Sequence, residues 1–390
     1  MPFFKKYLNI IVFLACWNLP LSIVGTFFDF REATTYLVLI IGLVLDTLII
    51  ILNIKKVRFN FFELVLIALL VSSTVIGIVN NASLDRRILT DLLNPLFFVF
   101  KIAVFRLIIF NDRGIIFLDE KWRYYAKQLF KFSFITLVLF LVLSQLRPMY
   151  AGIGLTTHPF LVHSLQSKSF VNVIFTFIVV LLTGKRALII SSIILVLIYM
   201  VYVKRNLIRM CLISLFLMLV IYITDFNSLN VSAVNKYIWT YELYIENGVQ
   251  LNLEDDNHYL DVISGGRLGE ITGATKEMRP IDYLIGRGIG FTYEYINPNS
   301  DEFPKYANLH FSPLSIITKY GIIFFAVLVL YILYTLRGFR NSSALGIFFG
   351  LYVIGVFIDS FFAYVVFVDP LFPLALGSLS GKKLERNLKT

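Results

Sequence analysis

Residues 311–336 read FSPLSIITKYGIIFFAVLVLYILYTL, and Lys319 is the only charged side chain among them. A helix of about 20 predominantly apolar residues is long enough to cross the hydrocarbon core of a bilayer. The other stretches of this kind are 7–28, 36–54, 61–80, 88–110, 128–146, 170–183, 187–203, 207–223, 344–359 and 361–377. The sequence therefore predicts an all-α, polytopic integral membrane protein with about eleven transmembrane helices.

Composition supports the same class. The chain is 58% hydrophobic, whereas soluble domains contain roughly 45–50% apolar residues. The formal charge of +10 could suggest nucleic acid as a partner, but its distribution argues against one. Residues 224–310 hold 13 acidic and 6 basic side chains, and the other 303 residues hold 29 basic and 12 acidic ones. Because basic residues gather in short loops, the positive-inside rule explains them without nucleic acid.

The charge pattern also predicts which loops face the cytoplasm, and it divides the chain into three regions. The basic turns at 55–58, 204–209 and 337–340, together with both termini, are expected in the cytoplasm. Residues 1–223 then form the N-terminal transmembrane helices, 224–310 one large extracytoplasmic loop with short helices, and 311–390 the C-terminal transmembrane helices and a cytoplasmic tail. Counting from either end places the large loop outside.

One segment conflicts with simple alternation. The stretches 128–146 and 170–183 would both run outward, so the chain has to return across the membrane between them. Residues 149–168 are short and polar for a full span. They are expected to form a re-entrant segment, which membranes tolerate where irregular backbone is buried in protein. The alternative is that one of the other stretches does not span.

Cationic residues at the outer ends of the predicted spans are the first candidates for chemistry. Lys185 and Arg186 occupy a tight turn between two apolar stretches, on the side that the positive-inside rule leaves poor in cations. They could reach toward headgroup phosphates, or they could form an anion clamp. Arg267 follows two glycines, and Arg279 and Arg287 follow it within twenty residues. Each could take part in binding an anion, or each could be an exposed arginine of a loop.

Further candidates are His310 and Lys101. His310 precedes the stretch 311–336 and has the ordinary pKa, about 6.5, that suits proton transfer; it could equally be an interface residue or bond a phosphate. Lys101 lies at membrane depth in 88–110 and could bind substrate or pair with Glu63 or Asp46. Asp91 and Arg106, near the ends of that stretch, are expected to reach the interfaces. With two cysteines and no metal-binding pattern, we expect neither a metal nor a cofactor.

Four short motifs together resemble the O-antigen polymerase and O-antigen ligase superfamily of bacterial polysaccharide assembly. Residues 183–187 (TGKRA) resemble its Ser/Thr-x-x-Arg turn. Residues 265–267 (GGR) resemble its Gly-Arg element, and residues 285–290 (IGRGIG) resemble the Gly-x-Gly element that follows. Residues 308–314 (NLHFSPL) are similar to its loop-closing histidine motif, and 154–159 (GLTTHP) to an upstream Gly…Asn-Pro element. The chain departs from the pattern at Lys185, where Ser is commoner, and at Phe311, where Asn usually follows the histidine.

The resemblance implies a metal-independent glycosyltransferase of the GT-C architecture in the bacterial inner membrane. Its substrates would be oligosaccharides on undecaprenyl diphosphate, with membrane lipid and a chain-length regulator protein as possible partners. Arg186 and Arg267 would stabilise the departing diphosphate, and His310 would deprotonate or orient the acceptor hydroxyl, or contact the diphosphate. The substrate-binding candidates are Arg287, Arg279, Lys185, Lys101 and Asn308.

Other functions remain open at this stage. An O-antigen ligase of the same superfamily would use the same chemistry. A lipid-linked oligosaccharide flippase would be a transporter, with short loops and related halves, whereas this chain has one 87-residue segment between unequal blocks. A peptidoglycan polymerase would need a catalytic acid in the large loop, for which Asp261 and Glu270 are the candidates.

Overall fold

The computed structural model is mostly helical and describes residues 2–28, 31–80, 86–109, 112–146, 157–182, 186–204, 267–276, 278–294, 305–306, 308–337, 339, 343–362, 366–367, 369 and 371–389. The N-terminal helices are α1 (Pro2–Phe27), α2 (Arg31–Leu52), α3 (Phe61–Asn80), α4 (Arg86–Ile109) and α5 (Asp112–Leu146). They are followed by α6 (His158–Gln166), α7 (Phe170–Leu182), α8 (Arg186–Ile198) and the π-helical η1 (Tyr199–Lys204). The C-terminal elements are α12 (Arg267–Thr275), α13 (Pro280–Ile285), β1 (Tyr293–Glu294), β2 (Lys305–Tyr306), α14 (Ser312–Leu336), α15 (Ala344–Asp359) and α16 (Phe372–Lys389).

Five helical segments within the described ranges are long and apolar enough to cross a membrane. They are Lys5–Phe27, Phe61–Asn80, Ile88–Leu107, Glu120–Leu143 and Ser312–Leu336. Shorter apolar segments lie at Ile40–Leu52, Phe170–Leu182, Leu188–Val203, Ala344–Asp359 and Phe372–Gly381. These helices indicate a membrane protein. The predicted stretch 207–223 and most of the large loop lie outside the described residues.

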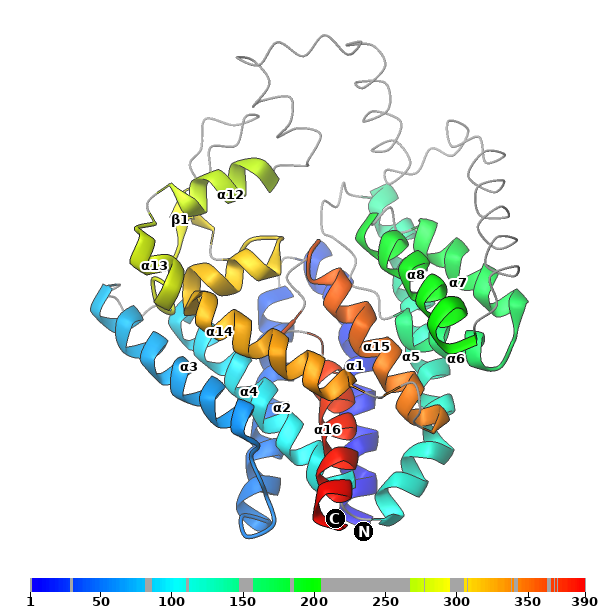
Figure 1. Ribbon diagram of the computed structural model, residues 1–390. Coiled ribbons are helices and arrows are strands. Elements are labelled where there is room, and N and C mark those ends of the chain that lie inside the picture. Colours follow the sequence, from blue (N-terminus) through cyan, green and yellow to red (C-terminus); the bar gives the residue numbers. More distant parts are fainter. Residues whose placement is uncertain are drawn as a thin grey trace.

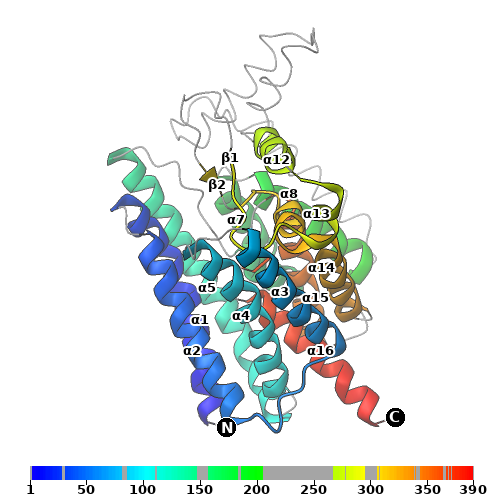
Figure 2. The same cartoon turned by 90° about the vertical axis from the view of Figure 1, so that its left-hand side faces the viewer.

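The two ends of the bundle differ in what they carry. Both termini lie at one end, together with the turn between α2 and α3, while α12 and β1 lie at the opposite end (Figure 1). Figure 2 shows α1 and α2 running side by side along one flank, where the two helices pack together. The basic turn 55–58 is therefore at the same end as the termini, and the side of the membrane that this end faces stays a prediction.

One expected apolar helix is wrong. The stretch 361–377 is not one helix, because α15 ends at Asp359 and α16 begins only at Phe372. A carboxylate oxygen of Asp369 accepts hydrogen bonds from the backbone N–H groups of Leu371 and Phe372, at 2.9 and 2.8 Å, and so caps the new helix. Helix α16 then continues through the basic residues expected to form a tail. Helix α5 begins at Asp112 and contains the whole predicted stretch 128–146.

The predicted re-entrant segment 149–168 is described only from Thr157. The described part contains α6, a helix of nine residues, or about 14 Å, which is too short to cross a bilayer. Pro159 lies in the first turn of α6, where a missing N–H costs no hydrogen bond. Eight of the nine residues are buried, so this short helix is enclosed by protein. The path of residues 149–156 stays a prediction.

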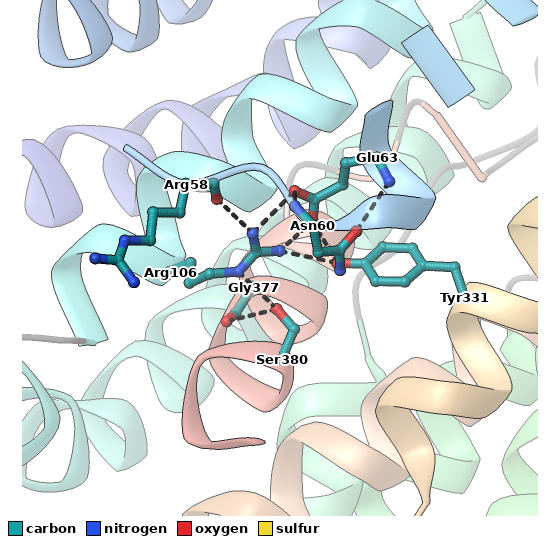
Figure 3. A network of polar contacts seen from close by, with 7 residues as sticks. All are labelled: Arg58, Asn60, Glu63, Arg106, Tyr331, Gly377 and Ser380. Carbon is teal, nitrogen blue, oxygen red and sulfur yellow. Dashed lines mark hydrogen bonds and ion pairs between the residues drawn. The ribbon is translucent and has the colours of Figure 1, made fainter. Parts of the chain in front are cut away.

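Near the termini, a buried network joins α3, α4, α14 and α16 (Figure 3). The Arg106 guanidinium pairs with the Glu63 carboxylate and donates to the Arg58 carbonyl oxygen at 2.7 Å. Its remaining N–H groups reach Ser380 Oγ and the Tyr331 hydroxyl oxygen, both at 3.2 Å. The expectation that Arg106 reaches the interface is therefore wrong. A buried guanidinium is tolerated here because its donors meet acceptors on every side.

Candidate functional site

The strongest candidate site lies where the chain enters α14, at the end of the molecule opposite the termini. His310 Nδ1 lies 2.7 Å from Glu270 Oε1, and the His310 backbone N–H donates to Glu270 Oε2 at 3.0 Å. The Glu270 side chain is 11% exposed and the His310 side chain is 64% exposed. The carboxylate thus holds both the backbone and the ring of His310. With Nδ1 engaged, Nε2 is the nitrogen that can exchange a proton with a substrate.

Arg267 is brought close to this pair by its helix. It is the first residue of α12, and Glu270 lies three positions later, a spacing that places two side chains on one helix face. The Arg267 side chain itself lies outside the described residues. Sequence reasoning assigned Glu270 a role only under the peptidoglycan polymerase alternative. No sequence signal pairs Glu270 with His310, because forty positions separate the two residues.

Arg186 begins α8, and its side chain, like the whole of Lys185, lies outside the described residues. Five positions along α8, Ser191 Oγ lies 3.2 Å from His158 Nε2. The same nitrogen lies 2.7 Å from Asp359 Oδ2, at the end of α15. This buried pair links the first half of α8 to α6 and α15. In the sequence, His158 appeared only as part of the motif 154–159, and Asp359 was not a candidate.

The chain of contacts continues to the start of α14. Ser360 follows Asp359, and its carbonyl oxygen accepts from the Ser312 backbone N–H at 2.9 Å. Ser312 lies two residues after His310. The structure therefore connects the helices that start at Arg186 and Arg267 with His310 through a series of short contacts, although these segments are far apart in sequence.

Arg279 and Arg287, predicted to bind substrate, both contact a carboxylate of the protein itself. Both contact the buried Asp282 carboxylate, Arg279 at 3.1 Å and Arg287 at 3.6 Å. The Arg279 hydrogen bond holds the pKa of Asp282 below its ordinary value, with burial acting against it. Because the folded pKa is lowered, this carboxylate contributes stability above its unfolded pKa of about 4 and loses the contribution as pH falls through the folded value. These arginines therefore secure the turn before and after α13.

The loop 286–290 contains Arg287, which the sequence suggested as an anion-binding residue. In the structure, backbone N–H groups of this loop donate hydrogen bonds to α14. Arg287 N–H donates to the Thr318 carbonyl oxygen at 2.8 Å and Gly288 N–H to that of Lys319 at 3.0 Å. Those carbonyl groups are accessible because α14 is kinked at Gly321, where φ is 87°. The loop therefore closes the C-terminal end of the first part of α14, as a helix end requires.

Gly288 provides a test of this packing. Its φ is +90°, and a Cβ there would meet the backbone of Gly77 in α3. We expect Gly288→Ala to destabilise the protein by about 1–3 kcal/mol. Alanine is strained in this left-handed backbone conformation, and its Cβ would push the loop away from Gly77. The thermal unfolding midpoint in detergent measures this, with Thr272→Ala, at an exposed position of α12, as the control. An unchanged midpoint for Gly288→Ala would contradict the packing role.

Below the loop lies a buried ion pair between α4 and α14. Lys319 Nζ lies 2.6 Å from Asp91 Oδ1, and the two side chains are 0% and 6% exposed. Asp91 Oδ2 accepts from the Gly290 N–H at 2.9 Å, and Lys319 also donates to Asn308 Oδ1 at 2.7 Å. Asp91, expected at the interface, is thus buried. Asn308, a predicted substrate contact, is held by Lys319 two residues before His310.

Lys101, predicted to bind substrate or to pair with Glu63 or Asp46, is buried in α4. Its ammonium lies 3.9 Å from the centroid of the Phe97 ring. It interacts electrostatically with Asp46 and Asp369, whereas Glu63 is engaged by Arg106. The alternative of pairing with Asp46 agrees with this placement.

No group of three or more His, Cys, Asp or Glu side chains suited to a metal ion occurs among the described residues. No family model, curated protein or solved structure matches the chain. The residues of the site and their geometry therefore have to carry the functional assignment.

Proposed function

We propose that the protein is a polysaccharide polymerase of the bacterial cytoplasmic membrane, with about eleven spans and a GT-C architecture. It transfers a glycan from an undecaprenyl-diphosphate donor to a hydroxyl of an acceptor repeat unit on the outer face, and releases undecaprenyl diphosphate. The observation that supports the proposal best is the contact between His310 and Glu270 at the end of the bundle opposite the termini. Glu270 lies three positions after Arg267 in α12.

In the proposed reaction, the acceptor oxygen forms a bond to the anomeric carbon as the bond from that carbon to the diphosphate oxygen breaks. His310 Nε2 takes the proton of the acceptor hydroxyl. Glu270, bonded to Nδ1, stabilises the positive charge that the imidazole ring gains. Negative charge develops on the departing diphosphate, so guanidinium groups of Arg186 and Arg267 positioned there would lower the barrier.

Deletion of the gene in its native host tests the product. We expect surface glycan that carries a single repeat unit, because repeat units are made and exported but are not joined. Loss of a ligase would instead leave long polymer on the lipid carrier, and loss of a flippase would leave unpolymerised units on the cytoplasmic side. Either of these two results would overturn the polymerase assignment.

Complementation with point variants tests the diphosphate contacts. We expect Arg186→Ala and Arg267→Ala to lower polymer formation by roughly 10²–10³-fold, the usual effect of removing a group that stabilises developing charge. Arg58→Ala is the matched control, because Arg58 is exposed near the termini and contributes only its carbonyl oxygen to Arg106. Wild-type chain lengths in both test variants, at equal membrane abundance, would refute the assignment.

A further inference from the structure

Helix α13 has an inverted distribution of polar and apolar side chains. Its polar residue, Asp282, is buried, whereas Ile281, Leu284 and Ile285 are 48%, 49% and 41% exposed. A surface helix of a soluble protein turns its apolar stripe toward the core. An apolar stripe turned outward indicates a membrane or protein contact.

The apolar face of α13 is continuous with that of two candidate spans. Gly321 of α14 packs against Leu284 and Ile285, and the next residues of α14, Ile322 and Ile323, are exposed. On the other side, Gly288 contacts Gly77 of α3, beside the exposed Ile78 and Val79. Helices α3 and α14 are both long and apolar enough to cross a membrane. The exposed apolar side chains of α13 therefore lie beside those of two candidate spans.

The flanks of α13 carry the residues that favour a bilayer interface. Arg279, immediately before the helix, has a side chain that is 71% exposed, and the exposed Tyr283 lies within it. Arginine beside an apolar face suits the phosphate region, and tyrosine is enriched at the same depth. At six residues, or about 9 Å, α13 is too short to span and long enough to lie in the interface.

We infer that α13 is an interfacial anchor of the extracytoplasmic segment, with phospholipid of the outer leaflet as its partner. Ile281, Leu284 and Ile285 are inserted among the upper acyl chains, and the Arg279 guanidinium faces the headgroup phosphates. This role accounts for Arg279 without assigning it to substrate. It depends on the membrane character of the protein and not on the polymerase reaction.

Spin labelling tests the anchor. A background without native cysteines, made with Cys16→Ala and Cys211→Ala, receives Leu284→Cys or Thr272→Cys and a nitroxide label. The protein is reconstituted in vesicles of phosphatidylethanolamine and phosphatidylglycerol. Relaxation by oxygen, which concentrates in lipid, is compared with relaxation by a water-soluble nickel chelate.

At Leu284 we expect an oxygen-to-nickel accessibility ratio several-fold higher than at Thr272, an exposed position of the polar helix α12. Equal ratios at the two sites would place α13 in water and overturn the inference. Low accessibility to both reagents at Leu284 would mean that protein covers the face, and would also overturn it. Correct folding of each variant is checked by elution and thermal unfolding in detergent.

Discussion

Replacing His310 by alanine is expected to lower the turnover number for polymer formation by about 10²–10⁴-fold, the usual contribution of a general base. Glu270→Gln is expected to lower it by a smaller factor. The amide can keep a hydrogen bond to Nδ1, but it lacks the charge that stabilises the protonated ring. Because neither change removes a proposed diphosphate contact, the KM for the lipid-linked donor should change little. Initial rates with purified donor and acceptor in proteoliposomes measure both constants.

Glu294→Gln is the matched control for this pair. Glu294 is an exposed acid of β1, a strand in contact with α12 at the same end of the molecule, and it has no assigned part in the reaction. It should retain the wild-type turnover number. A normal rate for Glu270→Gln would remove the acid from the mechanism. A raised KM with an unchanged turnover number for His310→Ala would make His310 a substrate contact and exclude it as the base.

Removing the Lys319 charge is expected to cost about 3–5 kcal/mol of unfolding free energy, because Asp91 is then left buried without its counter-charge. Lys319→Met and Asp91→Leu should each be strongly destabilising. The double variant should lose less than the sum of the two, since it leaves no isolated charge. Denaturant titration in detergent micelles gives the three free energies. Strict additivity would show that the two groups do not interact in the folded protein.

Lys319 is also expected to affect catalysis, which a buried charge far from the site would not do. Lys319 holds Asn308, and Glu270 holds His310, so the short segment 308–310 is fixed at both ends. Folded Lys319→Met should therefore have a lower turnover number per molecule. Arg106→Met breaks a comparable buried pair near the termini and should be destabilised to a similar degree. Its folded fraction should keep the wild-type specific activity, and a parallel loss there would make the Lys319 effect purely structural.

The local features of the site were partly accessible from sequence. His310 and Arg186 are predicted from their positions beside apolar stretches and Arg267 from the two glycines before it, and their helices are connected in the structure. Glu270 could not be assigned to His310 from sequence, because forty positions separate them and the contact depends on how α12 folds back on α14. The role of the glycines at 286–290, which is close packing on α3 and α14, was not predicted from sequence, because it depends on which backbone lies beside each glycine.

The sequence by itself determined that this is a helical membrane protein and where most of its apolar helices lie. That information is local, because about twenty consecutive apolar residues suffice to specify a span. Only the tertiary structure decided which polar side chains meet inside the bundle: Arg106 with Glu63, Lys319 with Asp91, and His158 with Asp359. A buried charge is stable only beside its partner, and the partner lies on another helix whose packing no single stretch of sequence encodes.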